Sequence, residues 1–246
     1  MSNRTVQSLW IGDRLSTMGR LGLRSFLANG HEFHLYCYDS PDGVPAGVSL
    51  KDAREILPAD RVFAYQDGFG RGSYSAFSNF FRYKLLLDRG GWWVDTDVVC
   101  LRPFDFSAEH VLASEHADPD EGGGVIAASN ALKQPRGSAL MAWAWRACQQ
   151  KNPDTLRWGE AGPRLLQTAI NTLGWQSFVQ LPDVFSPVPY YDWRRLIAPH
   201  NTFAFGKEVH AIHLWHQMWR EHGVDPDGSF PDGCLYEQLK RQFLIE

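Results

Sequence analysis

The stretch from Ser78 to Pro103 reads SNFFRYKLLLDRGGWWVDTDVVCLRP and decides the fold class of this chain. Its first half has apolar residues at helical spacing, so we predict a helix from about residue 76 to residue 88. Gly90 and Gly91 then end the helix, and we predict a strand over residues 92–101. A helix that leads through a glycine turn into an apolar strand is typical of α/β proteins.

Two aspartates, Asp95 and Asp97, stand two residues apart in this predicted strand. Side chains alternate along an extended segment, so we expect both carboxylates on one face, directly after the apolar start of the strand. Carboxylate oxygens suit Mn²⁺ or Mg²⁺, and these ions usually complete their coordination with water and substrate phosphate oxygens. The spacing therefore predicts a divalent metal site that binds a diphosphate leaving group.

Asn79 and Arg82 lie three residues apart on the predicted helix and therefore share one helix face. Eight residues of helix before Gly90 span about 12 Å, and the strand from Gly91 to Asp95 spans about 13 Å, so a chain reversal at the glycines brings Arg82 beside Asp95. We expect a polar cluster of Asn79, Arg82, Asp95 and Asp97. The alternative is an Arg–Asp ion pair that only closes the helix–strand hairpin.

The first 65 residues predict alternating strands and helices. We expect strands at residues 6–11, 33–38 and 61–65, a helix at 15–28 and a short helix at 51–57. This alternation favours a parallel, Rossmann-like sheet. A glycine-rich loop over residues 67–73 precedes the helix described above.

The second half of the sequence is less regular. Three glycines at positions 122–124 predict a bend before an apolar segment at 125–128. Further helices are expected at 139–149, from Pro163 onward, and at 235–245, the last packing back on the body. Residues 181–201 contain many prolines and aromatic residues without a clean period.

Composition limits the class of protein. The chain has 246 residues, of which 44% are hydrophobic and 21% charged, and this favours one ordinary globular domain. A formal net charge of −4 gives no electrostatic footprint for nucleic acid. We find no segment typical of a signal peptide or a membrane span. The four cysteines form no C-x-x-C pair, so we expect free thiols and a cytoplasmic protein.

The central stretch resembles the D-x-D sugar-binding region of retaining glycosyltransferases of the GT-A type. The resemblance rests on a composite motif, R-Y-x-x-L-x-x-x-G-G at residues 82–91 followed by aromatic-V-D-T-D at 93–97. Similar motifs occur in fungal mannosyltransferases, bacterial capsule and lipopolysaccharide glycosyltransferases, and clostridial toxin glucosyltransferases. The resemblance implies an α/β fold of the GT-A type, with a Rossmann-like open mixed sheet flanked by helices.

Residues at both ends of the chain also take roles from this resemblance. Leu9-Trp10-Ile11-Gly12 looks like the first strand of the family, which places Trp10 beside the uracil of a UDP-sugar. Residues 213–219, HLWHQMW, resemble the segment that closes the donor site and imply His213 as a metal ligand, with His216 as the alternative. The implied donor-binding residues are Trp10, Ile11, Gly12, Asn79, Arg82, Asp95 and Thr96. The implied catalytic residues are Asp95, Asp97 and Arg82, and the implied metal ligands are Asp95, Asp97 and His213.

The resemblance implies a metal-dependent hexosyltransferase that uses a UDP-sugar and Mn²⁺ or Mg²⁺ and retains the anomeric configuration. A saccharide, a lipid-linked glycan and a protein all stay open as acceptors. Asn79 replaces an aspartate that is frequent in such enzymes, so the identity of the donor sugar does not carry over. We expect one domain, with residues 1–104 binding the nucleotide sugar and residues 105–246 supplying the acceptor side and a closing segment. Peripheral contact with the inner face of a membrane stays open.

Two other functions stay open. The run Asp95-Thr-Asp-Val-Val99 fits the D-x-D-x-[T/V] motif of haloacid-dehalogenase-type phosphotransferases, with Asp95 as nucleophile and Asp97 as acid and base. That motif normally opens the first strand, and no later acidic pair follows here. A non-catalytic sugar-binding module is the third alternative. We expect the tryptophans at 143, 145, 175 and 193 in the core, with an acceptor-stacking platform as the alternative.

Two expectations concern the behaviour of the metal site. His213 is more than a hundred residues from the aspartates, so we expect residues 209–219 to be displaced until the donor binds. Because the two aspartates carry like charges, we expect Asp97→Asn to leave the melting temperature unchanged or to raise it.

Overall fold

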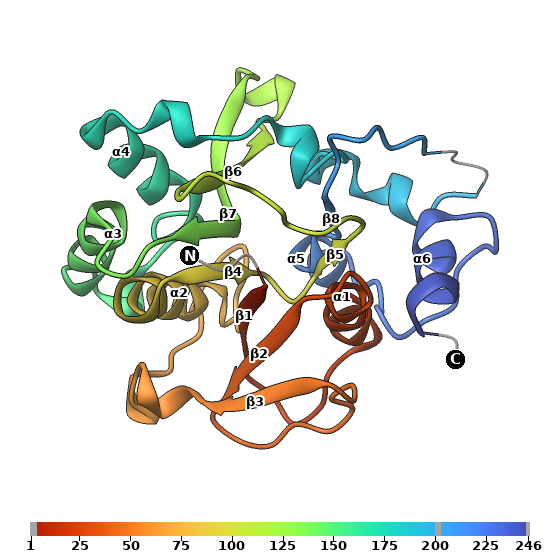
Figure 1. Ribbon diagram of the computed structural model, residues 1–246, viewed down its shortest axis with the longest axis horizontal. Coiled ribbons are helices and arrows are strands. Elements are labelled where there is room, and N and C mark those ends of the chain that lie inside the picture. Colours follow the sequence, from red (N-terminus) through yellow and green to blue (C-terminus); the bar gives the residue numbers. More distant parts are fainter. Residues whose placement is uncertain (1–3, 200–202, 245–246) are drawn as a thin grey trace.

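The computed structural model describes residues 4–199 and 203–244 and shows a mixed sheet between two layers of helices (Figure 1). The sheet has six strands in the order β3-β2-β1-β4-β7-β6. Their bounds are Thr5–Trp10 for β1, Glu32–Cys37 for β2, Val48–Asp52 for β3, Gly91–Val94 for β4, Val111–His116 for β6 and Val125–Gln134 for β7. Strands β1 to β4 pair in parallel, whereas β7 runs antiparallel to both β4 and β6.

A second, two-stranded sheet consists of β5 (Val98–Cys100) and β8 (Ala211–His213), which pair antiparallel. The helices are α1 (Thr17–Ala28), α2 (Ser75–Arg89), α3 (Ala139–Gln149), α4 (Pro163–Leu173), α5 (His216–Glu221) and α6 (Leu235–Leu244). Short 3-10 turns lie at Ala53–Glu55, Ala59–Arg61, Pro119–Glu121, Pro153–Thr155, Gln176–Phe178, Pro182–Val184 and Tyr190–Leu196. In Figure 1, α2, α3 and α4 gather on one side of the sheet, and α1, α5 and α6 gather with β5 and β8 on the other.

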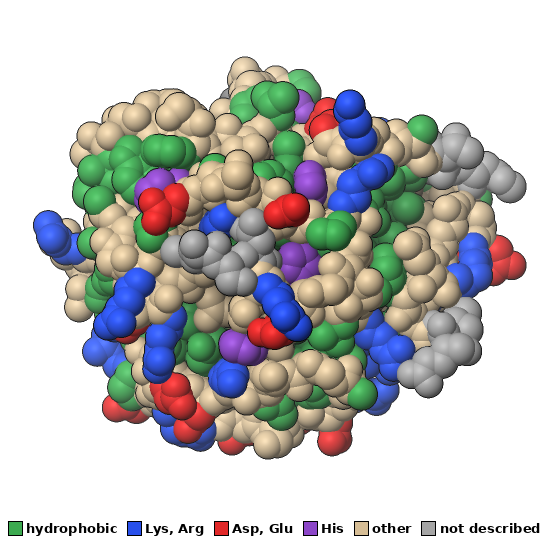
Figure 2. All heavy atoms as spheres, in the orientation of Figure 1, with side chains coloured by type: hydrophobic (Ala, Val, Ile, Leu, Met, Phe, Trp, Pro, Cys, Tyr) green, Lys and Arg blue, Asp and Glu red, His purple; other side chains and the backbone are tan. Residues whose placement is uncertain are grey.

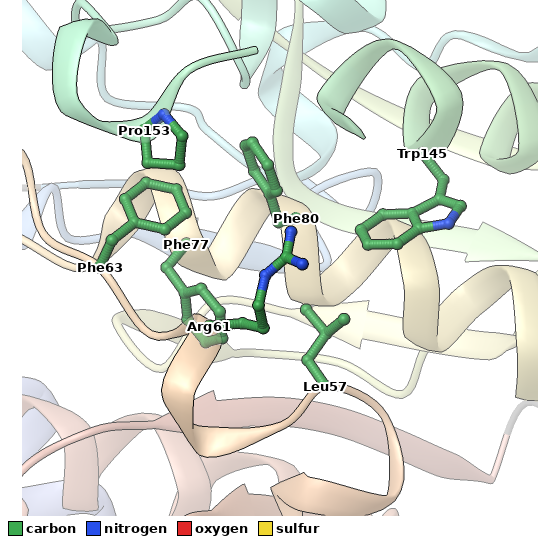
Figure 3. Close-up of a pocket in the computed structure, with 7 residues that line it drawn as sticks. All are labelled: Leu57, Arg61, Phe63, Phe77, Phe80, Trp145 and Pro153. Carbon is green, nitrogen blue, oxygen red and sulfur yellow. The ribbon is translucent and has the colours of Figure 1, made fainter. Parts of the chain in front are cut away.

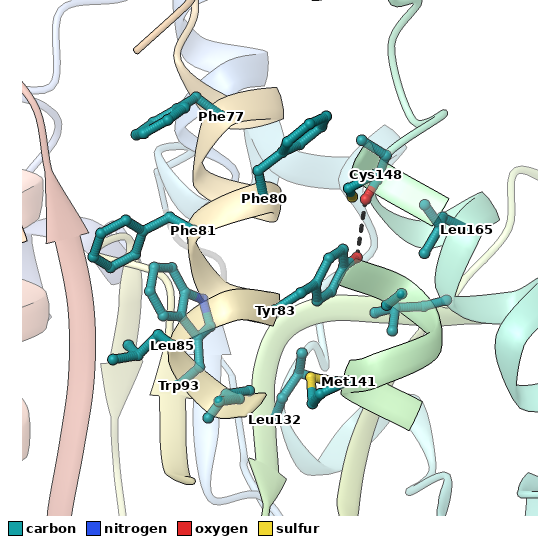
Figure 4. Close-up of a cluster of buried hydrophobic side chains, with 14 of the residues drawn as sticks. Phe77, Phe80, Phe81, Tyr83, Leu85, Trp93, Leu132, Met141, Cys148 and Leu165 are labelled. Atoms are coloured by element: carbon teal, nitrogen blue, oxygen red, sulfur yellow. Dashed lines mark hydrogen bonds between the residues drawn. The ribbon is translucent and has the colours of Figure 1, made fainter. Parts of the chain in front are cut away.

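Aromatic side chains attach α2 to the sheet (Figure 4). Phe77 and Phe81 of α2 are buried, and the Phe81 ring centroid lies 6.3 Å from that of Trp93 on β4. The hydroxyl of Tyr83, on the same helix, donates to the carbonyl of Ala161 at 3.0 Å. Full burial of each large apolar side chain stabilises the fold by about 1.5–3 kcal/mol, so the orientation of α2 is strongly fixed.

The opposite face of the sheet carries two further buried clusters. One packs Val6, Trp92 and Val98 with Phe104 and Phe185. The other joins α1, α5 and α6 to β5 and β8 and contains the buried rings of Trp193, Trp219 and Tyr236. The C-terminal helix therefore packs back on the body, as the sequence predicts.

Most of the predicted elements are confirmed to within a few residues. They are β1, α1, β2, α2, α3, α4 and α6. Residue 245, the predicted end of the last helix, lies outside the described residues. The GT-A expectation of an open mixed sheet is also confirmed, because β6 and β7 add antiparallel strands to the parallel part.

The predicted short helix at 51–57 is reduced to the 3-10 turn Ala53–Glu55, and the predicted strand at 61–65 is wrong. The third strand is β3, Val48–Asp52, which pairs in parallel with β2 at the edge of the sheet. Its sequence, VSLKD, lacks an apolar run because an edge strand is only partly covered, and Leu50 is 45% exposed. Asp52 then caps a single 3-10 turn by accepting a hydrogen bond from the Arg54 N–H at 2.9 Å.

The predicted strand over 92–101 is divided in two. β4 ends at Val94, and β5 begins at Val98 in the second sheet. The apolar residues on both sides of the aspartates are buried in either strand, so the hydrophobic pattern does not reveal the break. The segment predicted at 125–128 extends as β7 to Gln134.

The structure also describes the cysteines, the length and polarity of the helices, and the distribution of surface charge. Cys37, Cys100, Cys148 and Cys234 are buried and free. Within the described part of the chain, no helix is both long enough and apolar enough to cross a membrane. On the face shown in Figure 2, acidic and basic side chains are interspersed, in line with the small net charge.

Candidate active site

A tight turn after β4 carries the two aspartates. The Asp95 N–H donates to the carbonyl of Asn130 on β7 at 2.8 Å, and the Val98 N–H donates to the carbonyl of Asp95 at 3.1 Å. Residues 95–98 therefore form a hydrogen-bonded turn, not the extended segment that the sequence predicts. The two carboxylates still lie close together, as expected. The cause is the turn and not the alternation of side chains along a strand.

Helix α1 packs against this turn through Gly22. A Cβ atom on Gly22 would lie 2.3 Å from the carbonyl oxygen of Thr96 and 3.0 Å from that of Val98. Only glycine lets the helix approach the turn so closely. The glycine thus fixes the position of the turn relative to α1.

Arg82 lies beside Asp95, as the helix–strand geometry predicts. Its guanidinium is 2.9 Å from the Asp95 carboxylate, and the two side chains are 3% and 23% exposed. The same guanidinium donates to the carbonyl of Ser129 and lies 4.8 Å from the centre of the Trp93 ring. Burial raises the pKa of Asp95, whereas the Arg82 charge acts in the opposite direction.

Asn79 lies one turn before Arg82 and is buried. Its side-chain oxygen accepts a hydrogen bond from the Ser129 hydroxyl at 3.3 Å. A Cβ atom on Gly162, just before α4, would lie 3.1 Å from the Asn79 amide nitrogen. The predicted cluster of Asn79 and Arg82 is therefore present, with β7 and the start of α4 as additional walls.

Asp97 is held by the segment around β8. Its carboxylate lies 3.3 Å from Nε2 of His213 and accepts the His216 N–H at 2.8 Å. Its backbone carbonyl accepts the Leu214 N–H at 2.9 Å. Burial alone would raise the pKa of Asp97, but the His213 charge and these hydrogen bonds outweigh it and hold the pKa well below its usual range.

Asp95, Asp97 and His213 offer a metal-binding set. One ligand atom from each lies within 4.8 Å of the others. Within the described residues, Nδ1 of His213 is buried and lacks a hydrogen-bond partner. Two carboxylates and an imidazole suit a divalent ion such as Mn²⁺, so the donor set fits the expected cofactor. His216 contributes its backbone N–H, and its side chain is not in this set.

The segment that carries His213 is anchored in this structure, and the displacement of residues 209–219 before the donor binds stays a prediction. β8 pairs with β5 along its whole length, with His213 opposite Val98. Trp219 on α5 is fully buried, and its indole N–H donates to the carbonyl of Leu214 at 2.8 Å. Backbone pairing between β8 and β5 thus brings His213 close to the aspartates despite the long separation in sequence.

Strand β1 ends at Trp10, and Ile11 and Gly12 come directly after it. Because β1 and β4 are parallel neighbours, this end lies at the same sheet edge as the aspartate turn. The Trp10 indole nitrogen is buried and has no hydrogen-bond partner among the described residues. Gly12 has a φ of +138°, and a Cβ atom there would lie 3.5 Å from that nitrogen.

Residues 46–117 match the protein family described as "Glycosyltransferase sugar-binding region containing DXD motif". The matched stretch contains both aspartates of the D-x-D motif, Asp95 and Asp97. Solved structures of similar fold include the PaToxG glycosyltransferase, with 14% identity, a TM-score of 0.50 and 71% of each chain covered. The glycosyltransferase GlyE of Streptococcus pneumoniae TIGR4 has 15% identity and a TM-score of 0.57, and its apo form has 14% and 0.55.

These comparisons agree with the fold class inferred from the DXD region. The match to GlyE covers 99% of this chain but only 61% of the GlyE chain, and 100% and 61% for the apo form. The chain thus spans about 61% of the GlyE chains it matches. The haloacid-dehalogenase alternative loses its support, because the DXD motif follows β4 and not the first strand.

A small cavity beside α2 is not part of the DXD site (Figure 3). It measures about 20 Å³, room for a single water molecule, and lies against Phe77 and Phe80, on a different face of α2 from Asn79 and Arg82. Its walls are Leu57, Arg61, Phe63, Phe77, Phe80, Trp145 and Pro153. The DXD site is defined by its convergent polar groups and not by this cavity.

Sequence reasoning missed Glu115, a buried carboxylate on β6 close to the DXD site. Its side chain is 9% exposed, and its charge interacts with those of His213 and Asp95. Burial raises the pKa of Glu115 to about 7, the His213 charge acts against this rise, and Asp95 adds to it. A lone acid after the apolar Val111–Ala113 run was the available signal. The four tryptophans considered as a stacking platform instead pack on the core clusters, Trp193 fully and the others in part.

Proposed function

We propose that this chain is a metal-dependent glycosyltransferase that moves a hexose from a UDP-sugar to a glycan, a lipid-linked glycan or a protein acceptor, with retention. The observation that carries the proposal is the convergence of Asp95, Asp97 and His213 at one edge of the mixed sheet, with Arg82 2.9 Å from Asp95. The uridine nucleotide and the retention come from the resemblance of the motif.

Asp95, Asp97 and His213 would hold the divalent ion, Mn²⁺ or Mg²⁺. When bound, the ion supplies positive charge for the diphosphate that leaves. The protein's part is to keep both carboxylates ionised and in place. Arg82 does this for Asp95, and the His216 N–H does it for Asp97.

The remaining donor-site residues would bind and orient the nucleotide sugar. Trp10 would lie against the uracil, and its unpaired indole N–H would find an acceptor on the donor. Asn79 would bind a sugar hydroxyl through its amide, and Arg82 would orient the sugar. Ile11, Gly12 and Thr96 complete the proposed donor contacts. We assign no nucleophile.

We also propose that the whole chain works as one domain. The six-stranded sheet supports this, because β7 from residues 105–246 pairs directly with β4 from residues 1–104. In this proposal the first part binds the nucleotide sugar, and the second part contributes β8 and the acceptor side.

Release of UDP from a panel of UDP-hexoses, with Mn²⁺ or with excess EDTA, tests the proposal. We expect release with Mn²⁺, no release in EDTA, and loss in Asp97→Asn and His213→Ala. Asp60→Asn is the matched control, since Asp60 is exposed and outside the site. Full activity in EDTA would contradict the metal requirement. Absence of UDP release from every UDP-hexose in the presence of Mn²⁺ would contradict the proposed donor.

A further inference from the structure

A glycine-rich loop holds an exposed phenylalanine beside the site. The loop spans residues 65–73 and closes on itself, because the Gly72 N–H donates to the Tyr65 carbonyl at 2.7 Å and the Tyr65 N–H donates to the Ser73 carbonyl at 3.0 Å. Glycines 68, 70 and 72 have φ values of +67°, +84° and +75°. Residues with a Cβ atom rarely adopt such positive φ values, so these three positions favour glycine. The loop is therefore a defined structure, yet Phe69 at its tip is 40% exposed.

The exposed ring is one half of an aromatic pair. The Phe69 centroid lies 5.0 Å from that of Trp158, at an interplanar angle of 75°. Tyr65 supports Trp158 from within the loop, at 5.3 Å between centroids. A Cβ atom on Gly70 would lie 2.4 Å from the Trp158 ring, so the loop is shaped around this indole. The pair of Phe69 and Trp158 is thus preorganised.

Two connections link this aromatic pair to the DXD site. The Gly70 N–H donates to the carboxylate of Glu221 at 2.8 Å. Glu221 is the last residue of α5, and His216, the first, donates its N–H to Asp97. Six helical residues span about 9 Å, a distance that an oligosaccharide can bridge. From the other side, Trp158 lies four residues before Gly162, which packs against Asn79.

We propose that Phe69 and Trp158 form the acceptor subsite and stack on a sugar ring of a saccharide acceptor. This inference rests on the proposed function and names the acceptor class of the same site. A sugar ring has an apolar C–H face bordered by hydroxyls, and rigid aromatic rings offer such a face contact area at low entropic cost. Asp67, Arg71 and Arg157 are exposed and lie within two residues of Phe69 or Trp158 in the sequence, and polar side chains of this kind suit those hydroxyls.

A saccharide explains these features better than a lipid surface does. A lipid would call for a larger apolar face, whereas here the exposed Asp67 and Arg71 lie two residues from Phe69, and the exposed Arg157 precedes Trp158. The competing structural explanation is that Phe69 only packs the loop against Trp158. That explanation predicts lower stability without any change in acceptor use.

The test begins with the wild-type chain, Mn²⁺ and the UDP-hexose that gives the fastest UDP release. An array of immobilised oligosaccharides and peptides identifies what is glycosylated, and we expect oligosaccharides. Labelling of peptides alone would overturn the inference. Failure of UDP release and of transfer in the wild-type chain would instead contradict the proposed function, so the two failures are distinguishable.

The best oligosaccharide of the array is then titrated against Phe69→Ala, Trp158→Ala and the conservative Phe69→Tyr. We expect the KM for the oligosaccharide to rise about tenfold in both alanine variants, while the KM for the UDP-hexose stays within about twofold. Phe69→Tyr should restore the acceptor KM. Leu181→Ala removes another exposed apolar side chain, 74% exposed, and should change neither constant. An unchanged acceptor KM in folded Phe69→Ala would overturn the inference.

Discussion

Arg82 and Asp95 form the buried ion pair of the DXD site. The Arg82 side chain is only 3% exposed, and it contacts the Asp95 carboxylate, the Ser129 carbonyl and both oxygens of Ser78. Arg82→Met fills similar volume but leaves Asp95 without its cation, and loss of one partner of a buried pair costs about 3–5 kcal/mol. We expect urea unfolding to show such a loss. Arg89→Met, at an exposed ion pair, is the control and should cost under about 1 kcal/mol. Equal effects would contradict a structural role for the pair.

The surroundings of Asp97 change the effect that we expect Asp97→Asn to have on stability. Two adjacent aspartates suggest that Asp97→Asn relieves repulsion, but the structure surrounds Asp97 with His213 and the His216 N–H. Burial opposes the charged form and these partners outweigh it, so the carboxylate is stabilised in the fold. We now expect Asp97→Asn to lower the free energy of unfolding by about 1–3 kcal/mol, measured in EDTA at pH 7. A melting temperature at or above that of Asp60→Asn would restore the original expectation.

Glu115 provides the pH-dependent prediction. Burial and Asp95 raise its pKa from 4.5 to about 7 against the opposing charge of His213. The folded state therefore binds the proton more tightly than the unfolded state, so stability falls as pH rises from about 4.5 to 7. Glu115→Gln has no carboxyl group at this position, so it should not show this loss of stability. From pH 4.5 to pH 8, the free energy of unfolding of the variant should therefore rise by roughly 2–4 kcal/mol relative to that of the wild type. Denaturant unfolding at both pH values measures it. Glu109→Gln, an exposed site, should show no such pH-dependent gain.

At the scale of elements, α1 positions the DXD turn through one glycine. Gly22→Ala would place a Cβ 2.3 Å from the Thr96 carbonyl oxygen, so either α1 or the turn must move. Such overpacking costs about 1–3 kcal/mol, and we expect Mn²⁺ affinity to fall with it. Gly19→Ala, on the same helix, is the matched control, because its Cβ would lie 3.0 Å from the flexible Leu15 side chain and at an ordinary contact distance of 3.6 Å from the Ser16 and Trp10 side chains. Calorimetric titration with Mn²⁺ decides the point, and equal affinities in the two variants would contradict it.

The hydrophobic pattern of the sequence predicts those helices and strands that bury one face, because their apolar residues then repeat with a regular period. α3 is predicted to the residue, since its apolar positions repeat with the helical period. β3 and the break between β4 and β5 escape prediction for opposite reasons. The edge position of β3 removes the apolar signal, and burial on both sides of the DXD turn makes that signal continuous.

The site was predictable where it depends on local geometry. Arg82 meets Asp95 because a helix and a strand of known rise are joined by two glycines. The position of His213 followed from the resemblance alone, since no local rule pairs β8 with β5. Glu115 and the aromatic pair of Phe69 and Trp158 depend on contacts between distant segments, which a single sequence does not encode in any period.

At the scale of the whole molecule, the site draws on β1, α2, β8 and the turn between β4 and β5. A ligand that contacts all of them binds the folded chain and not the unfolded one, so it should raise the stability of the entire fold. At one hundred times its dissociation constant the gain is about 2.7 kcal/mol, which corresponds to a shift of about 5–10 °C for a chain of 246 residues. We expect UDP with Mn²⁺ to produce this shift in thermal unfolding and UDP in EDTA to produce little. His213→Ala should lose most of the shift, whereas His222→Ala, at an exposed histidine, should keep it. An equal shift with and without Mn²⁺ would show that the nucleotide binds independently of Asp95, Asp97 and His213.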